Sequence, residues 1–319
     1  MKRIFYLLLL SVPLVVLNCA AQNLEKVTIA EYGEYPLYTA LYLAESEGLF
    51  KKEGLDVTIV PAGGDEKVFA ALLSHDAEFG VGDPLFTAIS GERGKPGKIV
   101  FSLLQNVPAF GIALDKKVPE ITSPEMLKGF SVATYPSPST SYTLQKRLFE
   151  MGGLSPNITE IAYGALIPAL KANRVDIILE NEPNASTAVA NGGRVVYSMG
   201  TFFPDFAFTG VSVLPELIKE KPALIQKVVN ALKSASVIIY SNPELAITVL
   251  AKRFPELKTP VISSAIHNVV KAETFSIDGI TKKSGWDAAV NLRKAVGDLK
   301  SEARFEDYVI TTFAENANR

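Results

Sequence analysis

The feature that most constrains the fold is a regular alternation of short apolar strands with helical segments. Along the first third of the chain, strands are expected at 27–31, 56–60, 79–82 and 98–104, and helices at 37–47, 65–74 and 84–92. Strands and helices that alternate in this way form a largely parallel sheet with helices on both faces. Ligands of such sheets bind in the crevice beyond the carboxyl ends of the strands. The sequence therefore predicts an α/β fold with a site at that edge.

The same alternation restarts near residue 115 and predicts a second sheet. Its strands are expected at 130–134, 160–163, 176–179 and 195–198, and its helices at 139–151 and 165–172. A strand at 206–213 returns to the first sheet, and only helices follow it. Three of those helices open on prolines, which the first turn tolerates: Pro215, Pro222 and Pro243.

The pattern thus predicts two lobes joined by crossings near 112–116 and 203–209. Two lobes on two crossings form a hinged clamshell with mostly parallel sheets. The predicted division is a signal peptide at 1–18, lobe I at 19–113 and 207–319, and lobe II at 114–206.

The N-terminus carries an export signal. Lys2 and Arg3 precede an apolar run at 4–17, and Cys19 follows it closely. Such a run is too short for a permanent membrane helix. A cysteine at the cleavage point predicts a lipoprotein, anchored in the cell envelope through lipid on Cys19. The alternative is a plain secretory signal cut near Ala20, and either reading exports the mature chain.

Composition excludes several classes of function. Cys19 is the only cysteine, so the mature chain has no disulfide, no Cys-based metal site and no thiol nucleophile. Loss of Lys2 and Arg3 with the signal takes the formal charge from -2 to -4, and no Lys/Arg stripe appears, so nucleic acid is excluded as a partner. The two histidines, His75 and His267, are far apart, and no catalytic motif is present. We therefore expect no enzyme, no metal and no cofactor.

Three stretches carry the most specific pattern. They read YTALYLAESEGLFKKEGLDV at 38–57, LLSHDAEFGVGDP at 72–84 and LKANRVDIILENEP at 170–183. These stretches resemble extracellular solute-binding proteins for nitrate, sulfonates, taurine and thiamine-pyrimidine precursors. The resemblance implies a two-lobed type II periplasmic-binding-protein fold that hands a small-molecule solute to ABC permease subunits, and we expect it to act as a monomer. The sequence departs from the family at His75, where a Gly is usual, and at Asn181, where an aromatic residue is common.

The loop at 31–36 leaves the first strand at the edge where the crevice is expected. Tyrosines offer flat faces with a polar tip, which suit a ring-bearing solute. We predict ligand contact by Tyr32, Glu34 and Tyr35. The alternative is structural: Tyr38 packs inside the helix and Tyr32 covers the edge of a lobe.

Asp83 follows a core strand and precedes Pro84. This order predicts a helix N-cap, in which the carboxylate accepts hydrogen bonds from free amides of the first turn. The second carboxylate oxygen remains available to a bound amine, so we also count Asp83 as a ligand-binding candidate.

The helix at 139–151 opens on Ser139, Thr140 and Ser141, with no acid in its first turn. Hydroxyls and free amides at the positive end of a helix dipole favour an anion. We predict that these residues bind an anionic group of the solute. The alternative is an ordinary Ser-capped helix.

Glu180 and Asn181 follow the strand at 176–179 and are the remaining ligand candidates. Asn181 is a plausible N-cap, and Glu182 gains from the dipole of the helix that follows Pro183.

The four segments contain several acids and no Lys or Arg. A naked anion would meet like charge there unless a distant cation folds in. The sequence therefore favours a neutral or amine-bearing heteroaromatic solute, similar to a thiamine-pyrimidine precursor. The alternatives are a sulfonate- or nitrate-type anion receptor and a ligand-sensing lipoprotein that reports to a membrane kinase.

Overall fold

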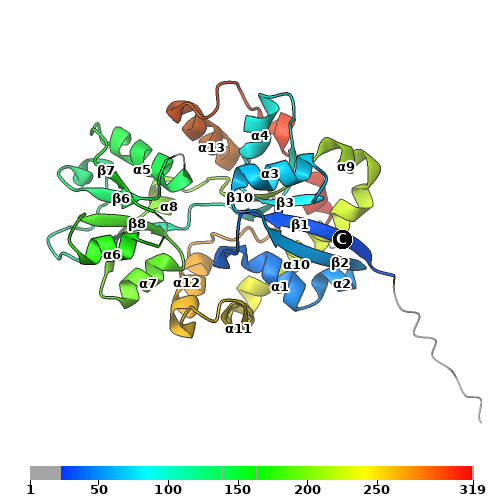
Figure 1. Cartoon of the computed structure of the whole chain (residues 1–319), viewed down its shortest axis with the longest axis horizontal. Coiled ribbons are helices and arrows are strands. Elements are labelled where there is room, and N and C mark those ends of the chain that lie inside the picture. Colours follow the sequence, from blue (N-terminus) through cyan, green and yellow to red (C-terminus); the bar gives the residue numbers. More distant parts are fainter. Residues whose placement is uncertain (1–22, 138, 163, 318–319) are drawn as a thin grey trace, which may run out of the picture.

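The computed structural model describes residues 23–137, 139–162 and 164–317, and these form two α/β lobes side by side (Figure 1). Each lobe is built on a five-stranded sheet. Cys19 and the predicted signal peptide lie outside the described residues. Among the described residues, no single helix is long and apolar enough to cross a membrane, and the one helix pair that qualifies together is bent by 111°.

The sheet of lobe I has the strand order β2-β1-β3-β10-β4. Its strands are β1 (Glu25–Glu31), β2 (Leu55–Pro61), β3 (Phe79–Gly82), β4 (Lys98–Leu104) and β10 (Thr209–Val213). β1 pairs in parallel with β2 and β3, whereas β10 runs antiparallel to β3 and β4 because it returns from the other lobe. β3 and β10 are buried along their whole length, as expected of central strands covered on both faces.

The sheet of lobe II repeats this plan in the order β7-β6-β8-β5-β9. Its strands are β5 (Ala109–Ala113), β6 (Val132–Thr134), β7 (Ile158–Glu160), β8 (Ile177–Asn181) and β9 (Arg194–Ser198). β6 is parallel to β7 and β8, and β5 is antiparallel to β8 and β9. The predicted two-lobed α/β fold is confirmed, and each sheet is mixed because the strand that enters from the other lobe runs against its neighbours.

Helices cover both sheets. Lobe I carries η1 (Pro36–Tyr38), α1 (Thr39–Ser46), α2 (Leu49–Lys52), α3 (Asp65–Leu73), α4 (Phe86–Gly91), α9 (Pro215–Glu220), α10 (Pro222–Ser241) and α11 (Pro243–Arg253). Lobe II carries η2 (Pro124–Leu127), α5 (Thr140–Met151), α6 (Leu166–Lys171), α7 (Asn184–Ala190) and α8 (Met199–Phe202). The C-terminal helices are α12 (Thr259–Lys271), α13 (Lys283–Val296), α14 (Phe305–Tyr308) and α15 (Thr312–Asn316). Pro215, Pro222 and Pro243 begin α9, α10 and α11, as the sequence predicted.

The chain leaves the first sheet earlier than predicted. β4 ends at Leu104 and β5 already pairs within the second sheet, so the first crossing lies at 105–108 rather than at 112–116. The sequence analysis missed β5 because a five-residue strand with a central glycine, AFGIA, has no apolar–polar alternation. Residues 109–113, predicted in lobe I, therefore pair with lobe II.

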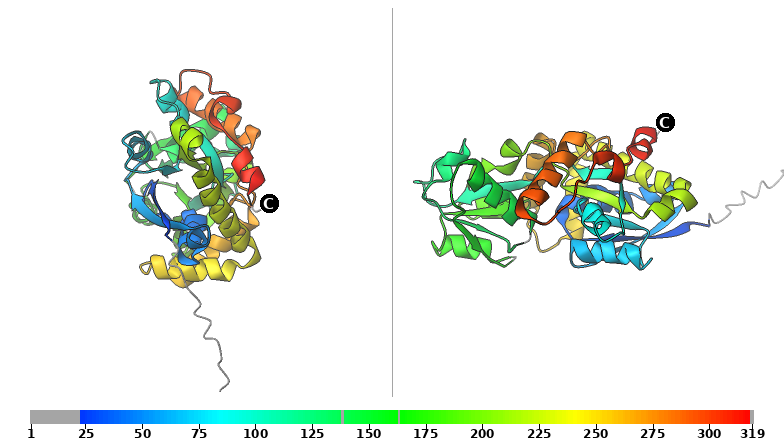
Figure 2. Two further views of the ribbon diagram at one scale, coloured as in Figure 1. Left: turned by 90° about the vertical axis from the view of Figure 1, so that its right-hand side faces the viewer. Right: turned by 90° about the horizontal axis from the view of Figure 1, so that it is seen from above.

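The C-terminal helices contact both lobes. α12 packs beside α7, and α13 packs beside α5, so the two helices flank the junction on opposite sides (Figures 1 and 2). Trp286 of α13 is fully buried in a hydrophobic cluster that also contains Ile99 of lobe I and Leu144 of lobe II. The lobes are thus joined by packed helices as well as by two crossings.

Candidate functional site

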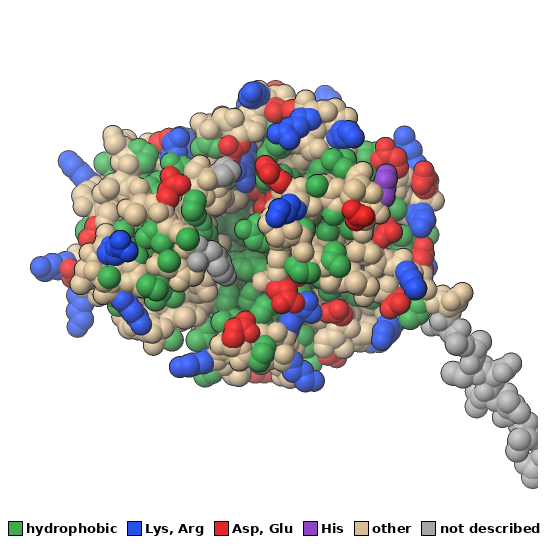
Figure 3. Space-filling view, in the orientation of Figure 1, with side chains coloured by type: hydrophobic (Ala, Val, Ile, Leu, Met, Phe, Trp, Pro, Cys, Tyr) green, Lys and Arg blue, Asp and Glu red, His purple; other side chains and the backbone are tan. Residues whose placement is uncertain are grey.

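The molecule is hollowed between the two lobes, and hydrophobic side chains form the floor of the hollow (Figure 3). β1 and β3 of lobe I and β6 and β8 of lobe II are the parallel strands whose carboxyl ends lead into the predicted segments. These carboxyl ends are the edge of the sheets at which the sequence predicts the ligand site.

Tyrosines dominate the loop after β1. Tyr32 is 49% exposed, whereas Tyr35 is partly buried and packs edge-on against Tyr38, with ring centres 5.5 Å apart. The backbone N–H of Tyr35 donates to the hydroxyl of Tyr42, 3.0 Å away. Tyr38 is buried in the core of lobe I, which confirms the structural interpretation for that residue.

Five residues in and around this loop form what we call the Arg253 cluster: Glu31, Glu34, Tyr42, Glu45 and Arg253. The guanidinium lies 4.0 Å from the centre of the Tyr42 ring and pairs with Glu34 at 3.1 Å and Glu45 at 2.8 Å. Glu34 therefore binds Arg253 and is 55% exposed. The cluster fastens the loop to α1 and α11.

Glu31 is the buried acid of this cluster, with none of its surface exposed. Its Oε2 accepts a hydrogen bond from the Tyr42 hydroxyl at 2.8 Å, and its Oε1 finds no partner among the described residues. Burial raises the pKa of Glu31 to about 7, although the Tyr42 hydrogen bond and the charge of Arg253 act in the opposite direction.

Both carboxylate oxygens of Asp83 bind other residues of the protein. Oδ1 accepts from the N–H of Leu85 at 2.9 Å, in the turn before α4, so the capping role is met one turn ahead of the helix itself. Oδ2 pairs with Arg293 at 2.6 Å and accepts from the hydroxyl of Thr140 at 3.2 Å. The oxygen expected to await a ligand amine is therefore occupied by a guanidinium.

Arg293 is the cation that the sequence analysis did not foresee. It reaches from α13, and it pairs with Asp298 at 2.8 Å as well as with Asp83, while donating to Thr140 at 3.0 Å. Burial opposes its charge, but the Asp83 and Asp298 carboxylates together outweigh burial and raise the pKa of Arg293. We call Arg293, Asp83, Asp298 and Thr140 the Arg293 cluster.

Asp65 adjoins the Arg293 cluster from α3. Its Oδ1 accepts from the backbone N–H of Asp83 at 2.8 Å. Burial, to which the charge of Asp83 adds, raises the pKa of the Asp65 carboxyl well above its usual range.

The N-terminus of α5 behaves as a Ser-capped helix, the alternative considered from the sequence. Ser139 Oγ accepts from the N–H of Tyr142 at 3.2 Å, and no acid lies in the first turn. Ser141 is buried, and the Thr140 hydroxyl is engaged with Asp83 and Arg293. Thr140 therefore contacts lobe I.

β8 extends to Asn181, two residues beyond the predicted strand end, and this end is more buried than the sequence suggested. Glu180 is 1% exposed and accepts hydrogen bonds from the Tyr135 hydroxyl and, at 3.4 Å, from Asn184. Burial raises the pKa of Glu180 to about 7. Asn181 ends β8, and its Oδ1 is buried without a partner among the described residues.

Glu182 holds the start of α7. Its carboxylate accepts from the N–H and the hydroxyl of Ser186, both at 3.0 Å, and from Asn268 of α12 at 2.9 Å. This agrees with the predicted dipole role. Because α7 begins at Asn184, the predicted N-cap at Asn181 was wrong.

Tyr135 is a candidate site residue that sequence reasoning missed. Burial and then Glu180 raise the pKa of its hydroxyl, and Tyr35 of the other lobe adds to this effect. The structure thus brings Tyr135 and Glu180 together and gathers Asp83 and Thr140 around Arg293. Tyr135 could have been found in the sequence because it directly follows a strand. No feature of the sequence around Arg293 indicates that it reaches the site.

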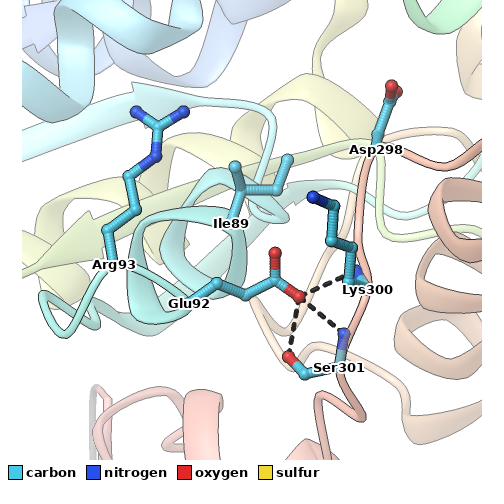
Figure 4. Close-up of a pocket in the computed structure, with 6 residues that line it drawn as sticks. All are labelled: Ile89, Glu92, Arg93, Asp298, Lys300 and Ser301. Atoms are coloured by element: carbon cyan, nitrogen blue, oxygen red, sulfur yellow. Dashed lines mark hydrogen bonds between the residues drawn. The ribbon is translucent and has the colours of Figure 1, made fainter.

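A separate surface pocket of about 520 Å³ lies between the end of α4 and the segment after α13 (Figure 4). It contains none of the predicted site residues. Glu92 closes one side, accepting from the N–H of Lys300 at 2.7 Å and from the N–H and hydroxyl of Ser301 at 2.6 and 2.8 Å. These bonds tie the C-terminal segment to α4, which is a structural role.

Comparison with known proteins shows the family of this chain. Residues 36–246 match the family described as NMT1/THI5 like. The chain is 24% identical over 302 residues to the putative binding protein YtlA of Bacillus subtilis (strain 168), covering 92% of this chain and 90% of that protein.

Solved structures share the fold. One is a periplasmic sulfonate-binding protein SsuA of a putative sulfonate ABC transporter from Methylobacillus flagellatus KT, with a TM-score of 0.74, 17% identity, and 92% and 93% of the two chains covered. Another is the ligand-binding component of an ABC-type import system from Staphylococcus aureus with zinc bound, with a TM-score of 0.72, 16% identity, and 92% and 99% covered.

The chain therefore belongs to the NMT1/THI5-like family and has the two-lobed fold of periplasmic binding proteins. The resemblance predicted from the sequence is confirmed. The relatives named above are binding proteins, which agrees with the expectation that this chain is not an enzyme.

Proposed function

We propose that this protein is the extracytoplasmic solute-binding component of an ABC importer. The cleft between its lobes captures a small organic solute, and the closed form delivers it to permease subunits. The family match, the hollow between the lobes and the names of the similar structures support this function.

The acidity of the cleft carries the proposal about the solute. Glu31, Asp65 and Glu180 are carboxyls at or beside the cleft whose pKa values burial raises. The two arginines that fold in, Arg253 and Arg293, are already paired with carboxylates. Buried acids that hold protons near neutral pH bind neutral or amine-bearing groups better than a free anion. We therefore propose a heteroaromatic solute with hydrogen-bond donors, of the thiamine-pyrimidine-precursor type.

A sulfonate- or nitrate-type anion is the second candidate, favoured by the sulfonate-binding protein of similar fold. Mass spectrometry of the solute that co-purifies, followed by calorimetry with an aminopyrimidine, an alkanesulfonate and nitrate, separates the candidates. Binding of the aminopyrimidine alone supports the proposal. Binding of either anion alone contradicts the proposed solute class and leaves the transport function standing.

Tyr35 is proposed to stack on the ring of the solute. Tyr35→Ala should weaken binding of the co-purified solute by about 1–3 kcal/mol, since a desolvated aromatic contact commonly contributes that much. Because Tyr35 also packs against Tyr38, unfolding should be measured in parallel. Unchanged calorimetric affinity together with a large loss of stability would show that Tyr35 is structural.

Attachment to the membrane through lipid on Cys19 is also a proposal. Cys19→Ser should remove the acylation site and release the protein from membranes. Partitioning into detergent checks this, and retention of the serine variant in the membrane fraction would contradict it.

A further inference from the structure

Three elements that are distant in the sequence meet at one guanidinium. Asp83 follows β3 in lobe I, Thr140 is the first residue of α5 in lobe II, and Arg293 comes from α13. Arg293 Nη2 lies 2.6 Å from Asp83 Oδ2 and 3.0 Å from Thr140 Oγ1, and the Thr140 hydroxyl lies 3.2 Å from the same carboxylate oxygen. The contact therefore joins the two lobes directly.

The surroundings strengthen this contact. The side chains of Arg293 and Asp83 are 6% and 9% exposed, so water screens their pairing little. The second arm of the guanidinium is fixed by Asp298 at 2.8 Å. Because both terminal nitrogens of the planar guanidinium are paired, its hydrogen bonds have one fixed geometry, which a lysine cannot reproduce.

We propose that Arg293 is a positioning residue for closure of the lobes, which holds Asp83 of lobe I against Thr140 of lobe II and so sets the closed geometry of the cleft. The Thr140 hydroxyl of lobe II donates to Asp83 of lobe I, so this bond breaks when the lobes separate. The hydrogen bonds between the Thr140 hydroxyl and the ion pair of Asp83 and Arg293 therefore favour the closed form even without solute.

This inference goes beyond the proposed function, because it concerns the balance between open and closed forms of the empty protein. Its test needs no solute. In the full chain carrying Cys19→Ser, Glu66→Cys on α3 and Arg174→Cys after α6 place spin labels on exposed positions of the two lobes. The protein is unfolded, dialysed free of small molecules and refolded before the distance distribution is measured.

Thr140→Val removes the bond between the lobes and keeps the shape of the side chain. The ratio of open to closed molecules should rise about tenfold, since a hydrogen bond to a charged group contributes roughly that factor. Thr140→Ser restores the hydroxyl and should return the wild-type distribution. Thr143→Val is the matched control, because the Thr143 hydroxyl bonds to the carbonyl of Ser139 inside lobe II at 3.0 Å.

Identical distributions for the wild type and Thr140→Val would overturn the proposal. An equal shift for Thr143→Val would also overturn it, since the effect would then belong to α5 alone. The proposal would also be overturned if the wild-type protein were fully open without solute. None of these results bears on whether the cleft binds a solute.

Discussion

The two arginine clusters differ in their surroundings, although in each of them an arginine pairs with an acid of the predicted site segments, Glu34 or Asp83. The Arg253 cluster lies within lobe I, and the side chain of Arg253 is 23% exposed, with its guanidinium over the Tyr42 ring and paired with two partly exposed carboxylates. The Arg293 cluster joins both lobes, and the side chain of Arg293 is 6% exposed between Asp83 and Asp298. We propose that the Arg253 cluster shapes the loop that contacts the solute and that the Arg293 cluster sets how the lobes meet.

The difference in burial decides which cluster is the more sensitive to change. A charge in water loses little when its partner is removed, whereas a buried charge that loses its partner is left without compensation. We therefore expect large effects at the Arg293 cluster and graded effects at the Arg253 cluster.

The sharpest comparison is between Arg293→Ala and Arg253→Ala. Loss of Arg293 leaves Asp83 and Asp298 without their counterion and should lower the free energy of unfolding by about 3–5 kcal/mol. Loss of Arg253 should lower it by about 1–2 kcal/mol. Denaturant unfolding measures both, and equal losses would break the distinction.

Glu31 gives the Arg253 cluster a pH dependence. Its pKa rises from 4.5 to about 7 on folding, so between these values the folded state binds more protons than the unfolded state. The contribution of Glu31 to the free energy of unfolding is therefore greatest below pH 4.5 and declines as pH rises through about 7. Glu31→Gln keeps an acceptor for Tyr42 and removes this decline, so it should be more stable than the wild type at pH 8 by up to about 3 kcal/mol.

The measurement is the free energy of unfolding of both proteins between pH 5 and pH 8. Glu66→Gln, which removes an exposed carboxylate of α3, serves as the control. A Glu31→Gln variant with the wild-type slope would show that Glu31 is not the group that titrates.

Tyr42 links the Arg253 cluster to the ligand loop. Tyr42→Phe removes the acceptor for the N–H of Tyr35 and the donor to Glu31, and it should cost about 1–2 kcal/mol of stability. Hydrogen exchange at the Tyr35 amide should become faster. Glu34→Gln, a change at an exposed ion pair, should cost about 0.5 kcal/mol or less and is the matched control. An unchanged rate of hydrogen exchange at the Tyr35 amide in the Tyr42→Phe variant would show that the Arg253 cluster does not stabilise the loop.

Much of the fold could be predicted from the sequence because each strand and helix carries its own local signal. The starts of α9, α10 and α11 were fixed by prolines, and Ser139 marked the start of α5. β5 escaped detection because it is short and lacks alternation. The capping role of Asp83 was predicted from the sequence, whereas the contact of Asp83 and Thr140 with Arg293 was not, because Arg293 is 210 residues from Asp83.

The sequence by itself determined the α/β class, the two lobes and the acidic character of the segments between them. These properties follow from the order and polarity of neighbouring residues, which the chain keeps in any conformation. Tertiary structure alone decided that Arg253 and Arg293 reach those acids, that Tyr135 donates to Glu180, and that Glu31 and Glu180 are buried enough to hold protons near neutral pH. Burial and long-range pairing depend on which distant segments pack together, and no local pattern records that choice.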